Sequence, residues 1–376
     1  MSIVTTREQN ESLPLRSCIR WWRLFAWTFW AGILLLWLLR TFVAQSHLLA
    51  APLTYLPQIL VGPALLMIGI PGWWWGRRLM LLCITTGIGF HASLFGGFWR
   101  QKAITSGVPL RVVFVNRGDQ DQLKWNEWVG KQSPDLLGLT DLRGRDGPSL
   151  TVGAPAIGGL PYLMRIGEHA LASRYPFKGT QVVKPDMPSA ATIRVQYLPA
   201  VRFEVDAPGG PVAIYVVHVR SPRDALSKYG SLKMWKWTLL GVPAHVSPSV
   251  TIGHYWDEQK LVIEGLLKRI EAETLPTIVL GDWNLPDFGP LYRRLTKQLQ
   301  DAHRVTGKGL GYTFPGDLSH WSALGKPWMR IDYVLADCKH WEIQECLVQS
   351  GQEAALSQHR ALNVGLKRIP QLPTKL

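Results

Sequence analysis

Long apolar runs occupy the first hundred positions of the chain, and shorter runs separated by turn residues occupy the rest. The first long run, residues 21–43, reads WWRLFAWTFWAGILLLWLLRTFV. It is long enough to cross a bilayer, because a spanning helix needs about 20 predominantly apolar residues. Two further apolar segments follow at about 48–75 and 79–99. We therefore predict about three transmembrane helices within residues 21–99.

Two alternatives remain open for this region. A secretory signal has an apolar core of about 7–15 residues and a small-residue cleavage site. The first run is longer than that and two more segments follow it, so we favour a retained anchor. The second and third segments also fit a re-entrant hairpin, because prolines interrupt the second and only Gly76, Arg77 and Arg78 link it to the third.

Basic residues predict the orientation, because they are enriched on the cytoplasmic side of membrane proteins. Four arginines precede or begin the first run and two more lie between the second and third segments. We therefore expect residues 1–20 to form a cytoplasmic tail, and three crossings place the rest of the chain on the outer side of the cytoplasmic membrane. Arg100 and Lys102 argue weakly for the opposite side, and an even number of crossings would reverse the prediction.

After a linker at residues 100–107, the pattern changes to short runs rich in β-branched residues and bounded by Gly, Pro and Asp, which is typical of strands. Residues 255–273 instead repeat their apolar positions at helical spacing beneath a charged face. This mixture predicts one α+β domain over residues 108–368, followed by a short tail at 369–376.

The composition agrees with a chain that contacts lipid. It does not identify a nucleic-acid partner, and it argues against a zinc site. The 376 residues are 47% hydrophobic and 18% charged, with 18 Trp, which is apolar for a purely soluble protein. The net charge of +14 divides equally between residues 1–107 and the remainder, and this bias is too mild to identify nucleic acid as the partner. The four cysteines show no metal-ligand spacing, which argues against zinc. Cys338 and Cys346 are close enough to pair in an oxidising compartment, although two unrelated buried thiols are the simpler interpretation.

The strongest chemical signal is a buried strand at 278–282 that delivers a carboxylate and a carboxamide, Asp282 and Asn284, two positions apart. Strand alternation directs both side chains to one face. The carboxylate can hold or deprotonate a water molecule, and the amide can donate to a charged oxygen without adding a titrating proton. Taken alone, Asp-x-Asn after a strand is more typical of an Asx turn.

Motifs near the end of the chain widen the interpretation. Arg-Ile-Asp-Tyr at 330–333 and Ser-Gln-His-Arg at 357–360 follow Gly-Asp-x-Asn in the order that resembles the endonuclease/exonuclease/phosphatase superfamily. Further matches extend the resemblance over about residues 109–367. They are Leu110 to Asn116, Pro134 to Asp141, Ala172 to Pro176, Val217 to Val219, and Gly311 to Pro315.

The resemblance implies a four-layer α/β/β/α sandwich in which strand ends converge on one open site. That site would hydrolyse a phosphoester bond with the help of Mg²⁺ or Mn²⁺. The substrate would be a lipid headgroup, a nucleic acid or a small phosphate ester, and nothing in the sequence indicates a protein partner.

The resemblance also implies roles for the residues that match its motifs. Asn116 and Asp141 would bind or orient the metal, since Mg²⁺ is a hard cation that prefers oxygen ligands. Asp282 would position and activate the attacking water.

Substrate contacts follow from the same resemblance. Asn284 and His218 would contact the phosphate oxygens, and Arg174 in the Ser-Arg-Tyr-Pro turn is a further expected substrate contact. His359, paired with Asp332, would stabilise the developing charge or assist the leaving group, because a carboxylate partner fixes the imidazole tautomer.

Three positions depart from the family pattern. Asp141 stands where a glutamate is usual, so its carboxylate is one methylene shorter, and Thr140 replaces a glutamine. Gln358 replaces the acid of Ser-Asp-His, and an amide accepts hydrogen bonds without supplying negative charge. The alternative hypothesis is therefore a catalytically impaired family member that acts as a membrane-bound binding or scaffold protein.

Overall fold

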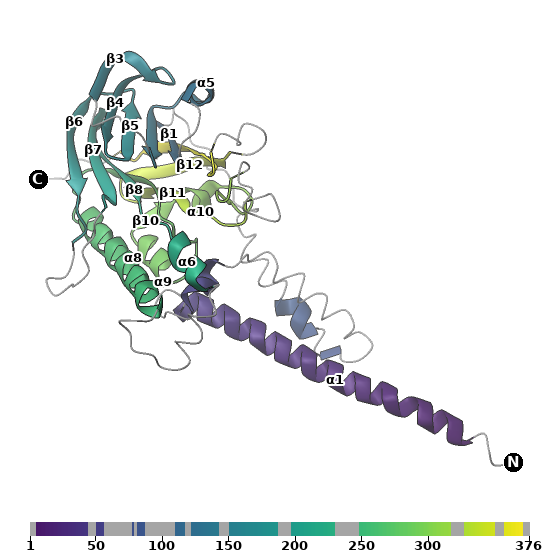
Figure 1. Cartoon of the computed structure of the whole chain (residues 1–376). Helices are drawn as coiled ribbons and strands as arrows, with labels where there is room; N and C mark the ends of the chain where they lie inside the picture. The colour runs from purple at the N-terminus through teal and green to yellow at the C-terminus, as the bar shows by residue number, and fades with distance from the viewer. Residues whose placement is uncertain are drawn as a thin grey trace, which may run out of the picture.

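In the computed structural model, two stacked β-sheets carry helices on their outer faces, and a long N-terminal helix extends away from them (Figure 1). The structure describes residues 5–43, 50–55, 77–78, 81–86, 110–116, 122–142, 150–186, 197–229, 248–316, 327–349 and 357–370.

The first sheet contains seven strands in the order β12-β13-β1-β2-β5-β4-β3. Its strands are β1 Leu110–Asn116, β2 Leu136–Thr140, β3 Leu150–Ile157, β4 Leu160–Ile166, β5 His169–Ser173, β12 Trp341–Val348 and β13 Leu362–Arg368. The pair β1 and β2 is parallel, with Asn116 opposite Thr140. Parallel pairing therefore brings the carboxyl ends of both strands to the same edge of the sheet.

The second sheet contains six strands in the order β10-β11-β9-β8-β7-β6. Its strands are β6 Phe177–Val183, β7 Ala200–Ala207, β8 Gly210–His218, β9 Thr277–Asp282, β10 Leu299–Asp301 and β11 Asp332–Asp337. Strands β8 and β9 are parallel, whereas β11 runs antiparallel to β9. The end of β8, the end of β9 and the beginning of β11 consequently lie side by side.

Alternate residues of the strands face different cores, which defines the layers. In β1, Val112 and Phe114 pack between the sheets, whereas Val113 and Val115 pack outward with Trp128 of a covering helix. The outer face of the second sheet is covered in the same way by apolar residues of another helix. The helices of the sandwich are α5 Gln122–Gln132, α6 Arg223–Tyr229, α8 Pro248–Glu271, α9 Pro290–Leu295 and α10 Ala302–Thr306.

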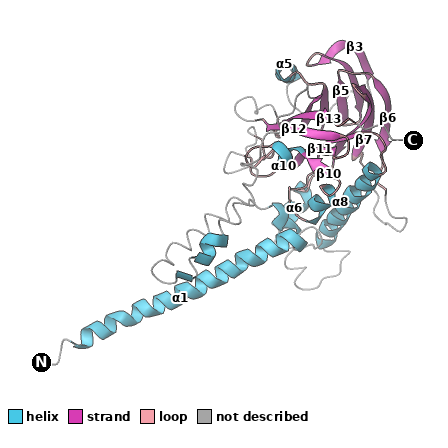
Figure 2. Ribbon diagram, turned by 180° about the vertical axis from the view of Figure 1, so that it is seen from behind, coloured by secondary structure: helices cyan, strands magenta, loops and turns pink. Residues whose placement is uncertain are grey.

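The layers confirm the predicted α+β sandwich of α/β/β/α type, with α5 outside the first sheet and α8 outside the second (Figure 2). Helix α9 packs in the same outer cluster as α8. The helix predicted over residues 255–273 is α8, and four of its five expected apolar positions are buried against the second sheet, whereas the fifth, Leu261, is half-buried and Val262 is buried beside it. Its buried positions include Val262, Ile263, Leu266, Leu267 and Ile270.

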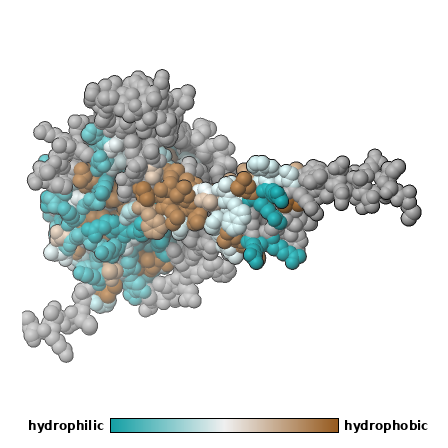
Figure 3. Space-filling view, turned by 90° about the horizontal axis from the view of Figure 1, so that it is seen from below, coloured by the Kyte–Doolittle hydropathy of each residue, from teal (hydrophilic) through white to brown (hydrophobic). Residues whose placement is uncertain are grey.

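The N-terminal region begins with α1 (Thr5–Leu38), which continues as the short π-helical turn η1 (Leu39–Val43). Within the described residues, the stretch Ser17–Val43 is the one helix long and apolar enough to cross a membrane, and little of it is buried. Seen from below, apolar atoms gather in one patch between the polar side of the sandwich and polar atoms further along the helix (Figure 3). The exposed apolar side chains of this helix include Trp21, Leu24, Phe25, Trp27, Leu35, Trp37, Leu38 and Phe42.

The prediction of about three membrane helices is corrected at the start of the second segment. Residues Ala51–Tyr55 form a 3-10 helix, η2, and Ala51 and Tyr55 belong to a buried cluster with residues of α6 and α8. These residues pack on the sandwich because the aromatic ring of Tyr55 stacks on Trp256, with ring centroids 5.8 Å apart. The remainder of the predicted second segment, and most of the third, lie outside the described residues.

Cys338 and Cys346 are separate thiols, as the simpler interpretation expected, but only one of them is buried. Cys338 is exposed, Cys346 is buried, and both are free thiols.

Candidate active site

Strand register gathers three ionisable residues at one edge of the second sheet. His218 lies opposite Asp282 across the parallel β8 and β9 pair, and Asp332 lies opposite Asp282 across β9 and β11. The approach of β8 to β9 requires glycine before the aspartate, since a Cβ on Gly281 would lie 2.5 Å from the carbonyl oxygen of Val217. The Gly-Asp motif thus places a carboxylate where three strands meet.

Asp282 is almost fully buried, and both of its carboxylate oxygens accept hydrogen bonds. Asn116 Nδ2 donates to Oδ2 at 2.8 Å, and the backbone amide of Asn284 donates to Oδ1 at 2.8 Å. Burial and the neighbouring Asp332 raise the pKa of Asp282 to about 6, against the opposing influence of two nearby histidines. Asn116, at the end of β1, thereby links the first sheet to the carboxylate of the second.

Asp332 and His359 form a close buried pair. The His359 Nδ1 atom lies 2.8 Å from Asp332 Oδ2 and 3.1 Å from Oδ1. Burial lowers the pKa of His359, but the charge of Asp332 and the hydrogen bond to it outweigh burial, and the pKa is raised overall. Because Nδ1 faces the carboxylate, the ring orientation is fixed and Nε2 is the nitrogen directed elsewhere.

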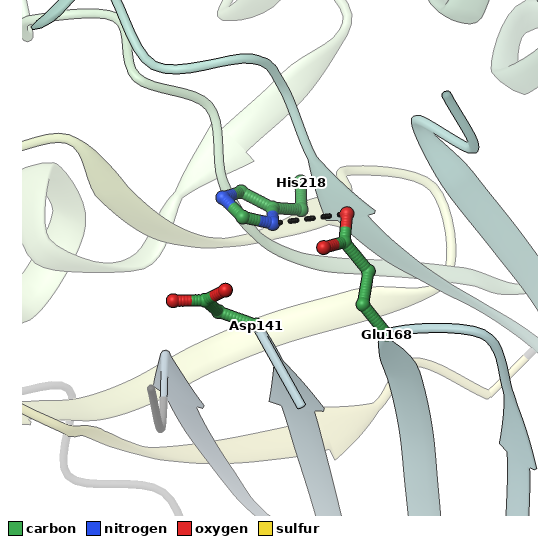
Figure 4. Close-up of side chains that lie close together, drawn as sticks. All are labelled: Asp141, Glu168 and His218. Carbon is green, nitrogen blue, oxygen red and sulfur yellow. Dashed lines mark hydrogen bonds and ion pairs between the residues drawn. The ribbon is translucent and has the colours of Figure 1, made fainter. Parts of the chain in front are cut away.

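A second group lies beside the first and is half-buried: Asp141, Glu168 and His218 (Figure 4). Each offers a ligand atom, and these atoms all lie within 4.8 Å of one another. His218 Nδ1 lies 3.2 Å from Glu168 Oε1, and His218 Nε2 lies 3.8 Å from Asp282 Oδ2. His218 therefore stands between the two groups.

The pKa of His218 reflects its three carboxylate neighbours. Burial lowers the pKa, but the hydrogen bond to Glu168 and the charges of Asp282, Glu168 and Asp141 raise it to about 9. A carboxylate-rich surrounding of this kind attracts any positive charge, whether a proton or a metal cation.

Glu168 is the member of this group that the sequence predictions missed. It lies in the turn between β4 and β5, after Gly167, whose φ is 62°. Strand β5 runs antiparallel to β2, with Ala170 opposite Leu139, so the residue before β5 lies beside the residue after β2. A hairpin-based register for the segment that ends in Ser-Arg-Tyr-Pro would have placed Glu168 near Asp141.

Asn284 lies next to Asp282 in a left-handed backbone conformation, with φ of 46°. Its side-chain Nδ2 donates to the Val219 carbonyl at 2.7 Å, and the residue is buried. Its own carbonyl accepts hydrogen bonds from Tyr55 and Gln259. The backbone of Asn284 is thus held on both sides, with its amide bonded to Asp282 and its carbonyl bonded to Tyr55 and Gln259.

The structure does not bring Arg174, an expected substrate contact, to either group. It follows β5 at the end where Ser173 pairs with Leu136, the first residue of β2, whereas Asp141 follows the last residue. Its guanidinium Nε donates to Asp135 Oδ1 at 2.8 Å and is half-exposed. The Ser-Arg-Tyr-Pro turn therefore stabilises the opposite end of the first sheet.

The Ser357 to His359 loop connects Asn116 to the histidine. Ser357 Oγ donates to the Asn116 carbonyl at 2.5 Å and accepts from the His359 backbone amide at 3.1 Å. Gln358, between them, has an exposed side chain, and its backbone carbonyl accepts a hydrogen bond from Gly316. The loop is therefore held through Ser357 and the backbone, independently of the side chain at position 358.

The donor chemistry of this edge fits a hard divalent cation. Carboxylates of Asp141, Glu168 and Asp282 and the amide of Asn116 are oxygen donors of the kind that Mg²⁺ and Mn²⁺ prefer. Among the residues that the structure describes, two groups meet the spacing of a metal site, Asp141 with Glu168 and His218, and Asp282 with Asp332 and His359. The half-buried first group is the more accessible of the two.

Comparison with known proteins identifies the type of domain. Residues 115–353 match the profile described as the Endonuclease/Exonuclease/phosphatase family. No curated protein matches the chain.

Solved structures similar to this chain include members of that family. One from Beutenbergia cavernae is 18% identical, with a TM-score of 0.45, over 70% of this chain and 72% of that one. The human Nocturnin catalytic domain is 13% identical, with a TM-score of 0.42, over 73% of this chain and 99% of that one. A mannosyl-6-phosphatase from Bacteroides thetaiotaomicron is 16% identical, with a TM-score of 0.40, over 69% and 99%.

Proposed function

Because the chain belongs to the endonuclease/exonuclease/phosphatase family, we propose that it is a membrane-anchored, divalent-metal-dependent phosphoester hydrolase. Residues 108–368 form the catalytic domain in this proposal, and the apolar stretch Ser17–Val43 is a retained anchor. The observation that supports the activity best is the buried Asp282, which accepts hydrogen bonds from Asn116 and Asn284 beside the Asp332–His359 pair.

Asn116, Asp141 and Glu168 are the residues that would hold Mg²⁺ or Mn²⁺ in this proposal. Their oxygen donors converge at one end of the first sheet, where Asp141 and Glu168 approach each other. The shorter reach of Asp141 is offset by Glu168, whose longer side chain enters from the neighbouring turn. When bound, the cation neutralises negative charge on the phosphate.

Asp282 orients the attacking water and accepts its proton. Its Oδ1 and Oδ2 are held by two amide donors, so the carboxylate keeps a fixed direction during the reaction. Holding the nucleophile and the phosphorus in line lowers the entropic part of the barrier.

His359 and His218 stabilise negative charge on the phosphate and on the leaving oxygen. The pairing with Asp332 fixes the His359 ring and favours its protonated form, which can donate to a phosphate oxygen or to the leaving oxygen. His218, held through Nδ1 by Glu168, presents Nε2 towards Asp282 and the phosphate.

Retention of the anchor is supported by contacts that cleavage would remove. Arg40 in η1 lies with its guanidinium 3.9 Å from the centroid of the Phe288 ring, and Arg293 donates to the Thr41 carbonyl at 3.0 Å. A cleaved signal has no need to pack on the mature domain, whereas an anchor does. The substrate in this proposal is a phosphoester, and the membrane location favours one presented at the lipid surface.

The proposal is tested with the purified full-length chain in detergent. Hydrolysis of bis(p-nitrophenyl) phosphate and of the monoester is measured with Mg²⁺, with Mn²⁺ and with EDTA. We expect metal-dependent turnover that Asp282→Asn lowers by about 10²- to 10⁴-fold, the usual contribution of a general base. Arg174→Ala is the matched control, and its turnover should equal that of the wild type, because Arg174 lies at the other end of the sheet.

The alternative is a scaffold with an impaired site, motivated by Gln358 and Asp141. A wild-type chain that hydrolyses neither ester, and has a melting temperature unaffected by millimolar Mg²⁺ or Mn²⁺, would support the scaffold.

A further inference from the structure

The segment just beyond the anchor, η2, contacts the loop that follows β9, residues 283–288, which we call the catalytic loop. The Tyr55 hydroxyl in η2 donates to the Asn284 carbonyl at 2.9 Å, a contact between residues 229 positions apart. Tyr55 is buried, and its ring stacks on Trp256 of α8. The residue that it contacts lies two positions after Asp282.

The Asn284 carbonyl matters because of the conformation of that residue. Asn284 has a φ of 46°, a left-handed conformation that costs free energy for any residue with a Cβ. The same residue donates its backbone amide to Asp282 Oδ1. A change in φ or ψ at Asn284 would therefore move both the hydrogen bond to the carboxylate and the direction of the side-chain amide.

Two side chains donate to the Asn284 carbonyl, one from the sandwich and one from η2. Gln259 of α8 donates through Nε2 at 3.3 Å, and Tyr55 donates at the shorter 2.9 Å. A buried carbonyl that loses a donor is left partly unsatisfied, which favours a different backbone conformation. The sandwich alone supplies the longer of these two bonds.

Neighbouring contacts show that η1 and η2 are docked on the same loop. Arg40 packs on Phe288, four residues after Asn284, and Thr54 is buried beside it. Arg40, Thr54 and Phe288 line a small, partly open pocket with Tyr312 and Arg330. The catalytic loop therefore lies between the strands that carry the acids and the segment that leaves the membrane.

We infer that Tyr55 is a positioning residue for the active site, which holds the left-handed Asn284 and through it the orientation of Asp282. The catalytic domain is then complete only when the segment next to the anchor is docked. This inference rests on the proposed hydrolase activity, and it places the control of that activity at the junction with the membrane helix.

The test compares two tyrosine-to-phenylalanine variants of the full-length chain in detergent. Tyr55→Phe keeps the ring that stacks on Trp256 and removes the hydroxyl. Tyr215→Phe removes a hydroxyl that bonds Glu273, away from the site, and is the matched control. We expect Tyr55→Phe to lower kcat for bis(p-nitrophenyl) phosphate by about three- to tenfold with KM unchanged, as loss of one hydrogen bond predicts. Tyr215→Phe should leave kcat unchanged.

Hydrogen exchange provides a readout that does not depend on turnover. The Asn284 amide, bonded to Asp282, should exchange faster in Tyr55→Phe than in wild type, while the amides of β9 keep their protection. If wild type itself shows no turnover, the hydrolase proposal fails, and the exchange rates alone decide whether Tyr55 holds the loop. Unchanged kcat together with unchanged exchange in Tyr55→Phe would overturn the inference, as would an equal effect of Tyr215→Phe.

Discussion

The two acidic groups at the strand ends differ in how they are held. Asp282 and Asp332 are each about 1% exposed and face each other across paired strands. Asp141 and Glu168 are half-buried and come from positions just beyond strands, one after β2 and one in the turn before β5. The buried group is therefore fixed by backbone register, whereas the half-buried group depends on loops.

The two groups suit two different requirements of a site that would hydrolyse a phosphoester, namely fixed geometry and access for a cation. A base and a charged histidine act best when their geometry is fixed before the substrate arrives. A cation must enter and leave, and its ligands are better placed where solvent reaches them. His218 joins the two groups, since one ring nitrogen faces Glu168 and the other faces Asp282.

Among changes that leave the general base Asp282 in place, the largest effect is expected from Asp332→Asn in the buried group. The change keeps the shape of the side chain and removes the charge that raises the pKa of His359. We expect kcat to fall by about 10²-fold or more, in the range of a lost acid–base partner, and the alkaline limb of the pH profile to move to lower pH. The measurement is kcat against pH with bis(p-nitrophenyl) phosphate.

Stability gives an independent check on the same pair. A histidine whose pKa is raised on folding stabilises the native state below its unfolded pKa, and this contribution is lost as pH rises through the folded value. The melting temperature of the wild type should therefore fall as pH rises through that window, and Asp332→Asn should weaken this dependence, leaving the part that His218 contributes through its own raised pKa. An unchanged pH dependence in the variant would show that Asp332 does not set the charge of His359.

The buried group was predicted from the order of the family motifs, because the resemblance implied that the strand ends carrying Asp282, Asp332 and His359 converge. Strands β9 and β11 place Asp282 opposite Asp332. The two-sheet sandwich was likewise implied by the resemblance, whereas the helix α8 was predicted from its own periodicity, since helical burial leaves a local pattern.

The half-buried group and the anchor contacts could not be predicted in full, because they depend on turns and on long-range packing. Glu168 is brought to Asp141 by a hairpin, and Arg174, which the Ser-Arg-Tyr-Pro motif suggested as a substrate contact, bonds Asp135 at the other end of the first sheet. Residues 51–55 were predicted as part of a membrane segment from their apolar composition. Tyr55 instead packs on Trp256, a contact that no local pattern reveals.

A smaller effect is expected when the half-buried group loses a charge. Asp141→Asn and Glu168→Gln should each weaken Mn²⁺ binding by about tenfold or more, since each removes a negative oxygen donor without changing side-chain size. Affinity is measured from the rise of the melting temperature with Mn²⁺ concentration, because a ligand selective for the native state stabilises it. Asp135→Asn is the control, since Asp135 pairs with Arg174 at the other end of the sheet. Equal affinity in all three variants would remove Asp141 and Glu168 from the metal site.

The smallest effect is expected from Gln358→Asp, which restores the acid usual in the family. The Gln358 side chain is exposed, and Ser357 already ties the loop to Asn116 and to the His359 amide. An added exposed carboxylate interacts weakly with buried groups across water, so we expect kcat to change by less than about threefold. The measurement is kcat for both phosphate esters at saturating Mg²⁺, with Gln358→Asn as the size-matched neutral control. A gain of tenfold or more in the acid variant alone would mean that the natural chain works with an incomplete site, because the missing charge rather than the loop geometry would then limit turnover.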